Sequence, residues 1–381
     1  MKIGVVKERR PNERRCAVSP DSVKKYVAAG AEVLIETGAG DGSSTPDAAF
    51  AAAGAKIVPD ARAALGDADV VLKVQRPLTA AEGNDELGLM KKGALLAAIL
   101  NPYGAKDAIN GYAQAGIVAC AMELVPRITR AQSMDVLSSQ SNLAGYKAVL
   151  DAAAEYGRAF PMMMTAAGTV APARVFIMGV GVAGLQAIAT ARRLGAIVSA
   201  TDVRPATKEQ VSSLGATFVA VEDEEFKQAE TAGGYAKEMS DSYKAKQAAL
   251  VAEHIKKQDV IITTALIPGR KAPVLVTEEM VKSMKPGSVI VDLAVEQGGN
   301  CPLSELGQVV EKHGVKLVGH ANVPGRLAAD ATSLYAKNLL NFLTLLIDKE
   351  TKGLKINWED EIVKGVALTR DGQIIHPNFK A

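Results

Sequence analysis

Residues 175–184, Val-Phe-Ile-Met-Gly-Val-Gly-Val-Ala-Gly, form an apolar run that ends in three glycines with the spacing G-x-G-x-x-G. A stretch of helical character follows over residues 185–194, and a second apolar run over residues 196–200 leads to Asp202. A buried strand, a tight glycine turn, a helix and a second strand with a terminal acid make up the βαβ unit that binds a dinucleotide. The segment therefore predicts an α/β domain built on a parallel sheet.

The three glycines of this segment have different expected roles. Gly179 makes the tight turn, Gly181 lets the backbone approach a pyrophosphate, and Gly184 lets the helix pack closely on the strand. The pyrophosphate would lie at the N-terminus of the helix, where free N–H groups and the helix dipole favour an anion. The alternative is a glycine-rich packing turn in an α/β domain that binds no ligand.

Asp202, at the end of the second strand, indicates which dinucleotide binds. Its carboxylate can accept hydrogen bonds from both hydroxyls of the adenosine ribose and would repel a 2′-phosphate. We therefore expect NAD(H), and not NADP(H), as the cofactor of this chain.

Composition excludes several classes of function. Lys and Arg total 44 against 42 Asp and Glu, so charge gives no indication of nucleic-acid binding. Three distant cysteines and four scattered histidines show no metal-ligand spacing, which fits a reducing cytosol and predicts no metal site. No apolar stretch reaches the ~18–20 residues that a transmembrane helix needs, so we expect no direct membrane insertion.

Strand-like and helical segments alternate along the whole chain, which predicts two Rossmann-like domains with parallel, doubly wound sheets and a cleft between them. We expect an N-terminal domain made of residues 1–135 plus 327–381, and an NAD(H)-binding domain over residues 136–326. Long helices are expected at 134–156 and 328–347, and a hairpin with its turn at Asp371-Gly372 within 360–376. Expected strands lie at 2–6, 32–36, 56–58, 70–74, 94–100, 117–121, 175–179, 196–200, 218–221, 260–265, 289–293 and 316–318.

Four segments resemble the NAD(H)-binding component, domain I, of proton-translocating nicotinamide nucleotide transhydrogenase. The first is the loop and helix of residues 127–146, which begins Arg-Ile-Thr-Arg-Ala-Gln-Ser-Met-Asp-Val-Leu-Ser-Ser. The others are residues 160–169 (Phe-Pro-Met-Met-Met-Thr-Ala-Ala-Gly-Thr), 230–239 (Glu-Thr-Ala-Gly-Gly-Tyr-Ala-Lys-Glu-Met) and 291–302 (Val-Asp-Leu-Ala-Val-Glu-Gln-Gly-Gly-Asn-Cys-Pro). The resemblance covers essentially the whole chain.

This resemblance implies direct hydride transfer between NAD(H) bound here and NADP(H) bound by a partner component. Proton translocation would be coupled to that transfer by a membrane-spanning component on another polypeptide. The chain would then be a cytoplasmic homodimer, peripheral to the inner (cytoplasmic) membrane through its partner subunits.

The resemblance also assigns roles to individual residues. The loop that meets the nicotinamide end matches at Arg127, Gln132, Asp135 and Ser138, and Gln132 would also face the NADP(H) component. The cofactor-binding positions are those of the glycine turn, the ribose site, the closing loop and the loop after the fourth strand: Gly179, Gly181, Val182, Gly184, Asp202, Arg204, Gly234, Tyr235, Ala265 and Leu266. For Arg127 and Asp135, a purely structural ion pair is the alternative.

Two other functions stay open from the sequence. The N-terminal half also resembles alanine dehydrogenase, where the positions of Arg15 and Lys73 bind substrate. However, residues 94–101 hold no histidine where that enzyme carries its proton donor, so we expect Arg15 and Lys73 to be structural. A regulatory NAD sensor without catalytic chemistry is the third possibility.

Overall fold

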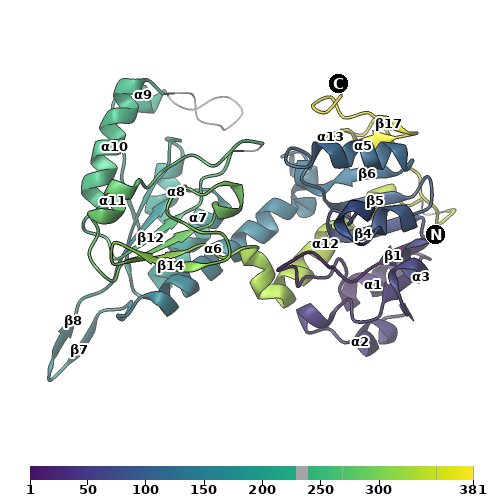
Figure 1. The fold of residues 1–381 in the computed structure, drawn as a ribbon, viewed down its shortest axis with the longest axis horizontal. Coiled ribbons are helices and arrows are strands. Elements are labelled where there is room, and N and C mark those ends of the chain that lie inside the picture. The colour runs from purple at the N-terminus through teal and green to yellow at the C-terminus, as the bar shows by residue number, and fades with distance from the viewer. Residues whose placement is uncertain (229–238, 268, 349, 381) are drawn as a thin grey trace. The chain divides into compact units, whose positions relative to one another are not determined.

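The computed structural model describes residues 1–228, 239–267, 269–348 and 350–380. The chain divides into two compact units. Unit 1 combines Met1–Gln140 with Pro324–Ala381, and unit 2 is the continuous segment Ser141–Val323 (Figure 1). Helix α6 (Val136–Glu155) carries the chain from one unit into the other. No helix within the described residues is both long and apolar enough to span a bilayer.

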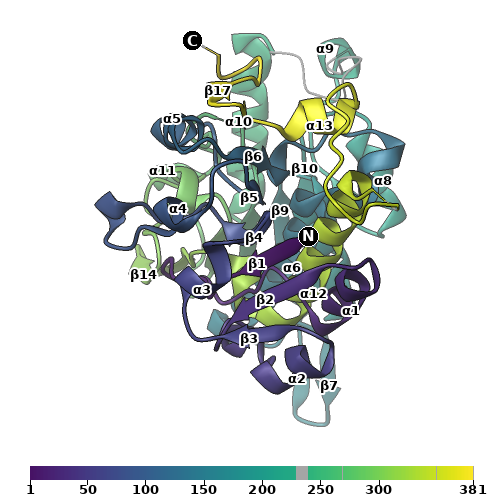
Figure 2. The ribbon, with the colours of Figure 1, turned by 90° about the vertical axis from the view of Figure 1, so that its right-hand side faces the viewer.

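Unit 1 is built on a six-stranded parallel sheet with the order β3-β2-β1-β4-β5-β6 (Figure 2). The order reverses between β1 and β4, which is the arrangement of a doubly wound sheet. Its strands are β1 (Lys2–Val5), β2 (Glu32–Glu36), β3 (Lys56–Val58), β4 (Val70–Gln75), β5 (Leu95–Ile99) and β6 (Val118–Ala121). A two-stranded hairpin, β16 (Thr369–Arg370) and β17 (Gln373–Ile374), completes the unit.

Helices cover both faces of this sheet because successive strand residues point to opposite sides. Val70 and Leu72 belong to the core under α1 and α12, whereas Val71 belongs to the core under α3 and α5. The helices of unit 1 are α1 (Pro20–Ala28), α2 (Asp47–Ala52), α3 (Ala61–Leu65), α4 (Glu86–Leu89), α5 (Lys106–Gln114), α12 (Ala328–Leu346) and α13 (Glu361–Val366). Short 3-10 turns are η1 (Asp41–Ser43), η2 (Ala80–Glu82), η3 (Met122–Leu124), η4 (Thr129–Met134) and η6 (Val323–Leu327).

Unit 2 is built on a seven-stranded sheet with the order β11-β10-β9-β12-β13-β15-β14, in which only β14 runs antiparallel. Its strands are β9 (Arg174–Met178), β10 (Ile197–Thr201), β11 (Thr217–Phe218), β12 (Val260–Thr263), β13 (Val289–Asp292), β14 (Val309–Lys312) and β15 (Val315–Val318). A separate hairpin, β7 (Met163–Thr165) and β8 (Gly168–Val170), precedes β9. The helical elements are α7 (Val182–Arg193), α8 (Thr207–Ser213), α9 (Glu224–Lys227), α10 (Asp241–Ile255), α11 (Glu278–Lys282) and the 3-10 turn η5 (Val295–Gln297).

The predicted α/β class with doubly wound parallel sheets is confirmed, but three local expectations were wrong. Helix α7 begins at Val182 and not at residue 185, because the helix starts directly at the glycine turn. The first half of the hairpin expected over 360–376 is helix α13, which Asp360 caps by accepting a hydrogen bond from Ile362 N (2.8 Å). Strand β14, which pairs antiparallel with β15, was not expected.

Candidate functional site

The glycine turn of unit 2 joins β9 to α7 and has two positions that only glycine fits. Gly179 has a φ of +103°, and a Cβ there would lie 2.5 Å from Thr264 Oγ1. A Cβ on Gly184 would lie 1.9 Å from the carbonyl oxygen of Gly179. At Gly181, by contrast, no described atom lies within 4 Å of where a Cβ would be. Two glycines therefore serve packing, and the third leaves the turn open to a ligand.

The N-terminus of α7 can receive an anion. Gly181 is its N-cap, and no side chain among the described residues caps the helix. The first N–H groups of a helix have no partner within the helix, so groups such as the Val182 N–H are left for a ligand. The turn is also held from behind, because a Cβ on Gly145 of α6 would lie 2.0 Å from the carbonyl oxygen of Ala183.

Asp202 lies just beyond β10 and is held by the glycine turn and by Arg204. Its Oδ2 accepts hydrogen bonds from Val180 N (2.7 Å) and Arg204 Nη2 (2.9 Å). Its Oδ1 accepts from the backbone N and the Nε of Arg204, both at 2.9 Å. The Arg204 Nη2 also donates to the carbonyl oxygen of Val180 (3.1 Å). The sequence suggested the acid but not this ion pair.

The loop after β12 is fixed by Asn300, a residue that was not singled out from the sequence. Asn300 is fully buried; its Oδ1 accepts from Ala265 N (3.1 Å), and its Nδ2 donates to the Ala265 carbonyl (2.9 Å). Thr264 Oγ1 donates to the carbonyl oxygen of Gly179 (2.9 Å), which ties this loop to the glycine turn. Leu266 follows and is 47% exposed. The signal available in the sequence was the segment Gly-Gly-Asn-Cys-Pro after β13.

Two expected cofactor-binding residues, Gly234 and Tyr235, lie outside the described residues. The other cofactor-binding candidates are all in unit 2, around the carboxyl ends of β9, β10 and β12. This is the end of a parallel sheet at which α/β proteins bind ligands.

The four candidates for the nicotinamide end, Arg127, Gln132, Asp135 and Ser138, belong to unit 1. Asp135 caps α6, since its Oδ1 accepts from Ser138 N (2.9 Å) and its Oδ2 accepts from Ser138 Oγ. Arg127 and Gln132 are exposed. The structure therefore joins Asp135 with Ser138 and leaves the side chain of Gln132 at the surface of η4.

The loop that carries Gln132 is anchored to elements from the far end of the chain. The carbonyl oxygen of Ser133 accepts from Asn338 Nδ2 (2.9 Å) and Asn341 Nδ2 (3.0 Å) of α12. Arg130 donates to both carboxylate oxygens of Asp360 (2.8 and 2.9 Å). These contacts fix the backbone on either side of Gln132, and they were not anticipated from the sequence.

Arg15 and Lys73 are buried and paired inside unit 1. Lys73 lies 3.2 Å from Glu8 Oε2 and 3.1 Å from Glu86 Oε2. Arg15 donates to both carboxylate oxygens of Glu13 (2.8 and 2.6 Å). Burial raises the pKa of Glu8 despite the opposing charge of Lys73. Burial also acts to raise the pKa of Glu13, but its bonds to Arg15 outweigh that effect and the pKa is lowered. Both cations thus already have carboxylate partners.

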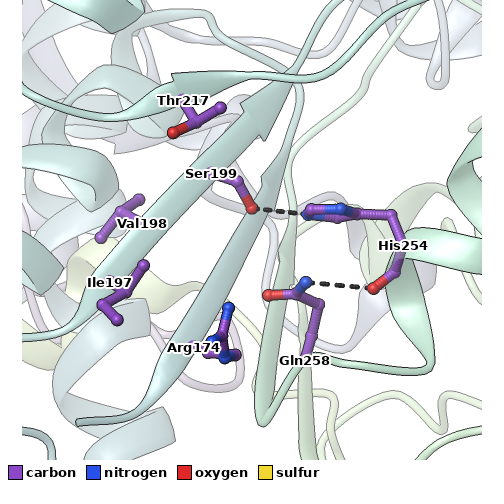
Figure 3. Close-up of a pocket in the computed structure, with 7 residues that line it drawn as sticks. All are labelled: Arg174, Ile197, Val198, Ser199, Thr217, His254 and Gln258. Atoms are coloured by element: carbon purple, nitrogen blue, oxygen red, sulfur yellow. Dashed lines mark hydrogen bonds between the residues drawn. The ribbon is translucent and has the colours of Figure 1, made fainter.

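A cavity of about 220 Å³ lies beside the amino-terminal halves of β9, β10 and β11, at the end of the strands opposite the glycine turn (Figure 3). Within it a hydrogen bond of 2.8 Å joins Ser199 Oγ and His254 Nε2. Burial lowers the pKa of His254, and the nearby Lys257 and Arg174 lower it further. The pair links α10 to β10 and lies apart from the dinucleotide turn. The described residues contain no cluster of His, Cys, Asp or Glu that could hold a metal ion.

Comparison with known proteins places the chain in a family. The model for "Alanine dehydrogenase/PNT, N-terminal domain" matches residues 4–144, and that for "Alanine dehydrogenase/PNT, C-terminal domain" matches residues 148–377. An NAD(P) transhydrogenase subunit alpha of Rhodospirillum rubrum is 64% identical over 377 residues, which cover 99% of this chain and 98% of that protein. An alanine dehydrogenase of Methanococcus maripaludis is 32% identical over 387 residues, covering 99% of this chain and 95% of that protein.

The fold agrees with these matches. The crystal structure of transhydrogenase from Sinorhizobium meliloti matches with a TM-score of 0.89 and 57% identity, and the match covers 98% of this chain and 100% of that one. The resemblance inferred from the sequence is confirmed. The chain belongs to the alanine dehydrogenase/PNT family, as a homologue of the alpha subunit of NAD(P) transhydrogenase.

Proposed function

We propose that this chain binds NAD(H) and exchanges hydride with NADP(H) held by a partner component, and that a membrane-spanning component couples the exchange to proton translocation. The glycine turn of unit 2 carries the proposal. Gly181 is open to a ligand, the start of α7 is uncapped within the described residues, and Asp202 lies at the adjoining strand end. The names of the transhydrogenase relatives support the reaction class.

The residues of unit 2 suit the parts of NAD(H). The backbone of Gly181 and Val182 would hold the pyrophosphate, Asp202 the adenosine ribose, and Ala265 and Leu266 would lie along the cofactor. Thr264 and Asn300 keep these groups in place through their bonds to Gly179 and Ala265. When bound, NAD(H) would supply or accept a hydride at its nicotinamide ring.

The sparse polar set of unit 1 also suits this reaction. Hydride exchange between two cofactors needs alignment and exclusion of water, and it needs no acid, base or nucleophile from the protein. Gln132 and Ser138 would orient the carboxamide of the ring, and the Asp135 cap would hold Ser138. The anchoring of Ser133 and Arg130 would keep Gln132 aligned between the two cofactors.

The decisive experiment mixes this chain with an isolated NADP(H)-binding component and follows the reduction of an NAD analogue by NADPH. We expect transfer that requires both proteins, with each protein alone as the control. Binding of NADH without any transfer would favour the sensor. Alanine-dependent formation of NADH would favour an alanine dehydrogenase, which the pairing of Arg15 and Lys73 with carboxylates argues against.

Gln132→Asn tests the assignment at the nicotinamide end. The shorter side chain should slow hydride transfer about 10–100-fold, because a shift near 1 Å in reacting groups has effects of that size. NADH affinity should change little, since the binding surface proposed for the nucleotide is in unit 2. Stopped-flow transfer rates and titration of NADH measure the two effects separately. Gln114→Asn, also an exposed glutamine of unit 1, is the control. Equal losses of rate and affinity in Gln132→Asn would contradict the role.

We also propose that the chain forms a homodimer through the hairpin β7–β8. Residues 159–173 contain no charged side chain, and Met162, Met163 and Met164 are 59%, 44% and 74% exposed. The hairpin projects from the seven-stranded sheet of its unit (Figure 1). An isolated two-stranded ribbon is marginally stable in water, and an exposed apolar surface marks a contact site. A neutral surface also fits a second copy better than it fits a charged partner.

Met164→Glu should therefore weaken the dimer by about tenfold or more, because the new carboxylate would lose water on association. Light scattering over a dilution series measures the change. Leu306→Glu, at an apolar residue that is 56% exposed outside the hairpin, is the control and should leave the dimer intact. A dimer equally stable in both variants would exclude the hairpin from the interface.

A further inference from the structure

We propose that Arg204 is a concealed ligand for a 2′-phosphate, and that Asp202 excludes NADP(H) by occupying it. This inference rests on the proposed binding of NAD(H) in unit 2 and concerns how the site selects between the two cofactors. Charge repulsion by Asp202 alone was the expectation from the sequence, and the ion pair changes that expectation.

The carboxylate of Asp202 has no spare acceptor capacity in the structure. It accepts four hydrogen bonds, one from Val180 N and three from Arg204. A carboxylate offers about four acceptor sites. A ribose hydroxyl that binds Asp202 must therefore replace part of the bonding from Arg204.

The ion pair also cancels charge at the end of β10. The Asp202 side chain is 7% exposed and the Arg204 side chain 30% exposed, so the carboxylate is largely covered and the guanidinium is partly open to solvent. A phosphate that approaches the ribose position would meet a neutral pair and not an isolated anion. The exclusion of a 2′-phosphate thus requires a cause other than simple repulsion.

That cause is the geometry of the guanidinium. Arg204 uses Nε and Nη2 on Asp202, and these two donors form the planar fork that binds phosphate in a bidentate manner. The bond from Nη2 to the Val180 carbonyl holds the same group beside the glycine turn. A ribose hydroxyl can donate to Asp202, whereas a 2′-phosphate cannot. For a phosphate to bind Arg204, it would have to strand a carboxylate that is nearly buried, which is costly.

Removal of Asp202 should therefore convert the cofactor preference. In Asp202→Ala, the donors of Arg204 lose their acceptor at a position suited to a 2′-phosphate. We expect the affinity for NADPH to rise about tenfold or more, the range of one charged hydrogen-bonded contact, and the affinity for NADH to fall. In Asp202→Ala/Arg204→Ala, the gain in NADPH affinity should disappear.

Calorimetry with 2′-AMP and 5′-AMP isolates the adenosine end of the site from the rest of the cofactor. Asp202→Ala should gain affinity for 2′-AMP over 5′-AMP, and the gain should weaken as salt is added. Asp202→Asn, which keeps the shape of the side chain, provides the same comparison if the alanine variant unfolds. A gain that persists without Arg204, or no gain in either Asp202 variant, overturns the proposal. Failure of the unaltered chain to bind NADH would instead refute the proposed function, so the two failures are distinguishable.

Discussion

Lys73→Met is expected to destabilise unit 1 by about 3–5 kcal/mol, the usual cost of removing one partner from a buried ion pair. The Lys73 side chain is 1% exposed, and its ammonium lies between carboxylates of Glu8 and Glu86 that are equally buried. Methionine fills similar space but leaves both carboxylates without that cation. Their pKa values in the folded variant should then be raised. The loss of stability should accordingly be larger at pH 8 than at pH 5, where protonation neutralises them.

The chain contains a probe specific for this unit. Its single tryptophan, Trp358, packs against the core of unit 1 with the guanidinium of Arg370 4.3 Å from its ring. Urea denaturation followed by tryptophan fluorescence therefore reports unit 1. Lys91→Met removes a surface pair with Asp69 (2.6 Å) and should cost less than about 1 kcal/mol. Similar losses in both variants would show that the buried pair has no special weight.

Gly184→Ala and Gly181→Ala should separate folding from cofactor binding in unit 2. At Gly184 the new methyl group would collide with the backbone carbonyl of Gly179, which cannot move without disturbing β9. We expect a loss of about 3 kcal/mol in stability, at the upper end for overpacking, and a loss of NADH binding as a consequence. At Gly181 the methyl group meets no described atom, so the fold should keep its stability.

Gly181→Ala should nevertheless weaken NADH binding by about 1–3 kcal/mol, because the methyl group would occupy the space through which a pyrophosphate reaches the turn. Hydrogen exchange of α7 measures the stability of the unit, and calorimetry with NADH measures binding. If Gly181→Ala binds NADH normally, the turn does not hold the pyrophosphate. If Gly184→Ala is as stable as the unaltered chain, the close approach to Gly179 is not essential.

The sequence predicted those parts of the fold that have a local signal. Buried strands such as Val175–Met178 are continuous apolar runs, and α12 has a long apolar face, so both were expected within a few residues of where they lie. Strand β14 was missed because residues 309–312 alternate apolar and charged side chains over only four positions at a sheet edge. Helix α13 was missed because six residues carry too little periodicity to distinguish a helix from a hairpin arm.

Prediction of the site was limited for a different reason. The glycine spacing and the terminal acid are local patterns, so the turn and Asp202 could be proposed from the sequence. The pairing of Arg204 with Asp202 depends on side-chain conformation, and the Asn300 contact with Ala265 joins residues from separate strand ends. Partners of this kind become visible only when the sheet has brought the strand ends together.

The discontinuity of unit 1 has a consequence for synthesis of the protein. All six strands of its sheet precede residue 122, but much of one core face is supplied by α12, whose Tyr335, Leu339, Phe342 and Leu343 are fully buried. Unit 2 is one uninterrupted segment that leaves the ribosome before α12 does. The dinucleotide unit can therefore complete its fold while the earlier segment still has an uncovered apolar sheet. Nascent chains released before α12 should for that reason contain a native unit 2 and an aggregation-prone amino-terminal half.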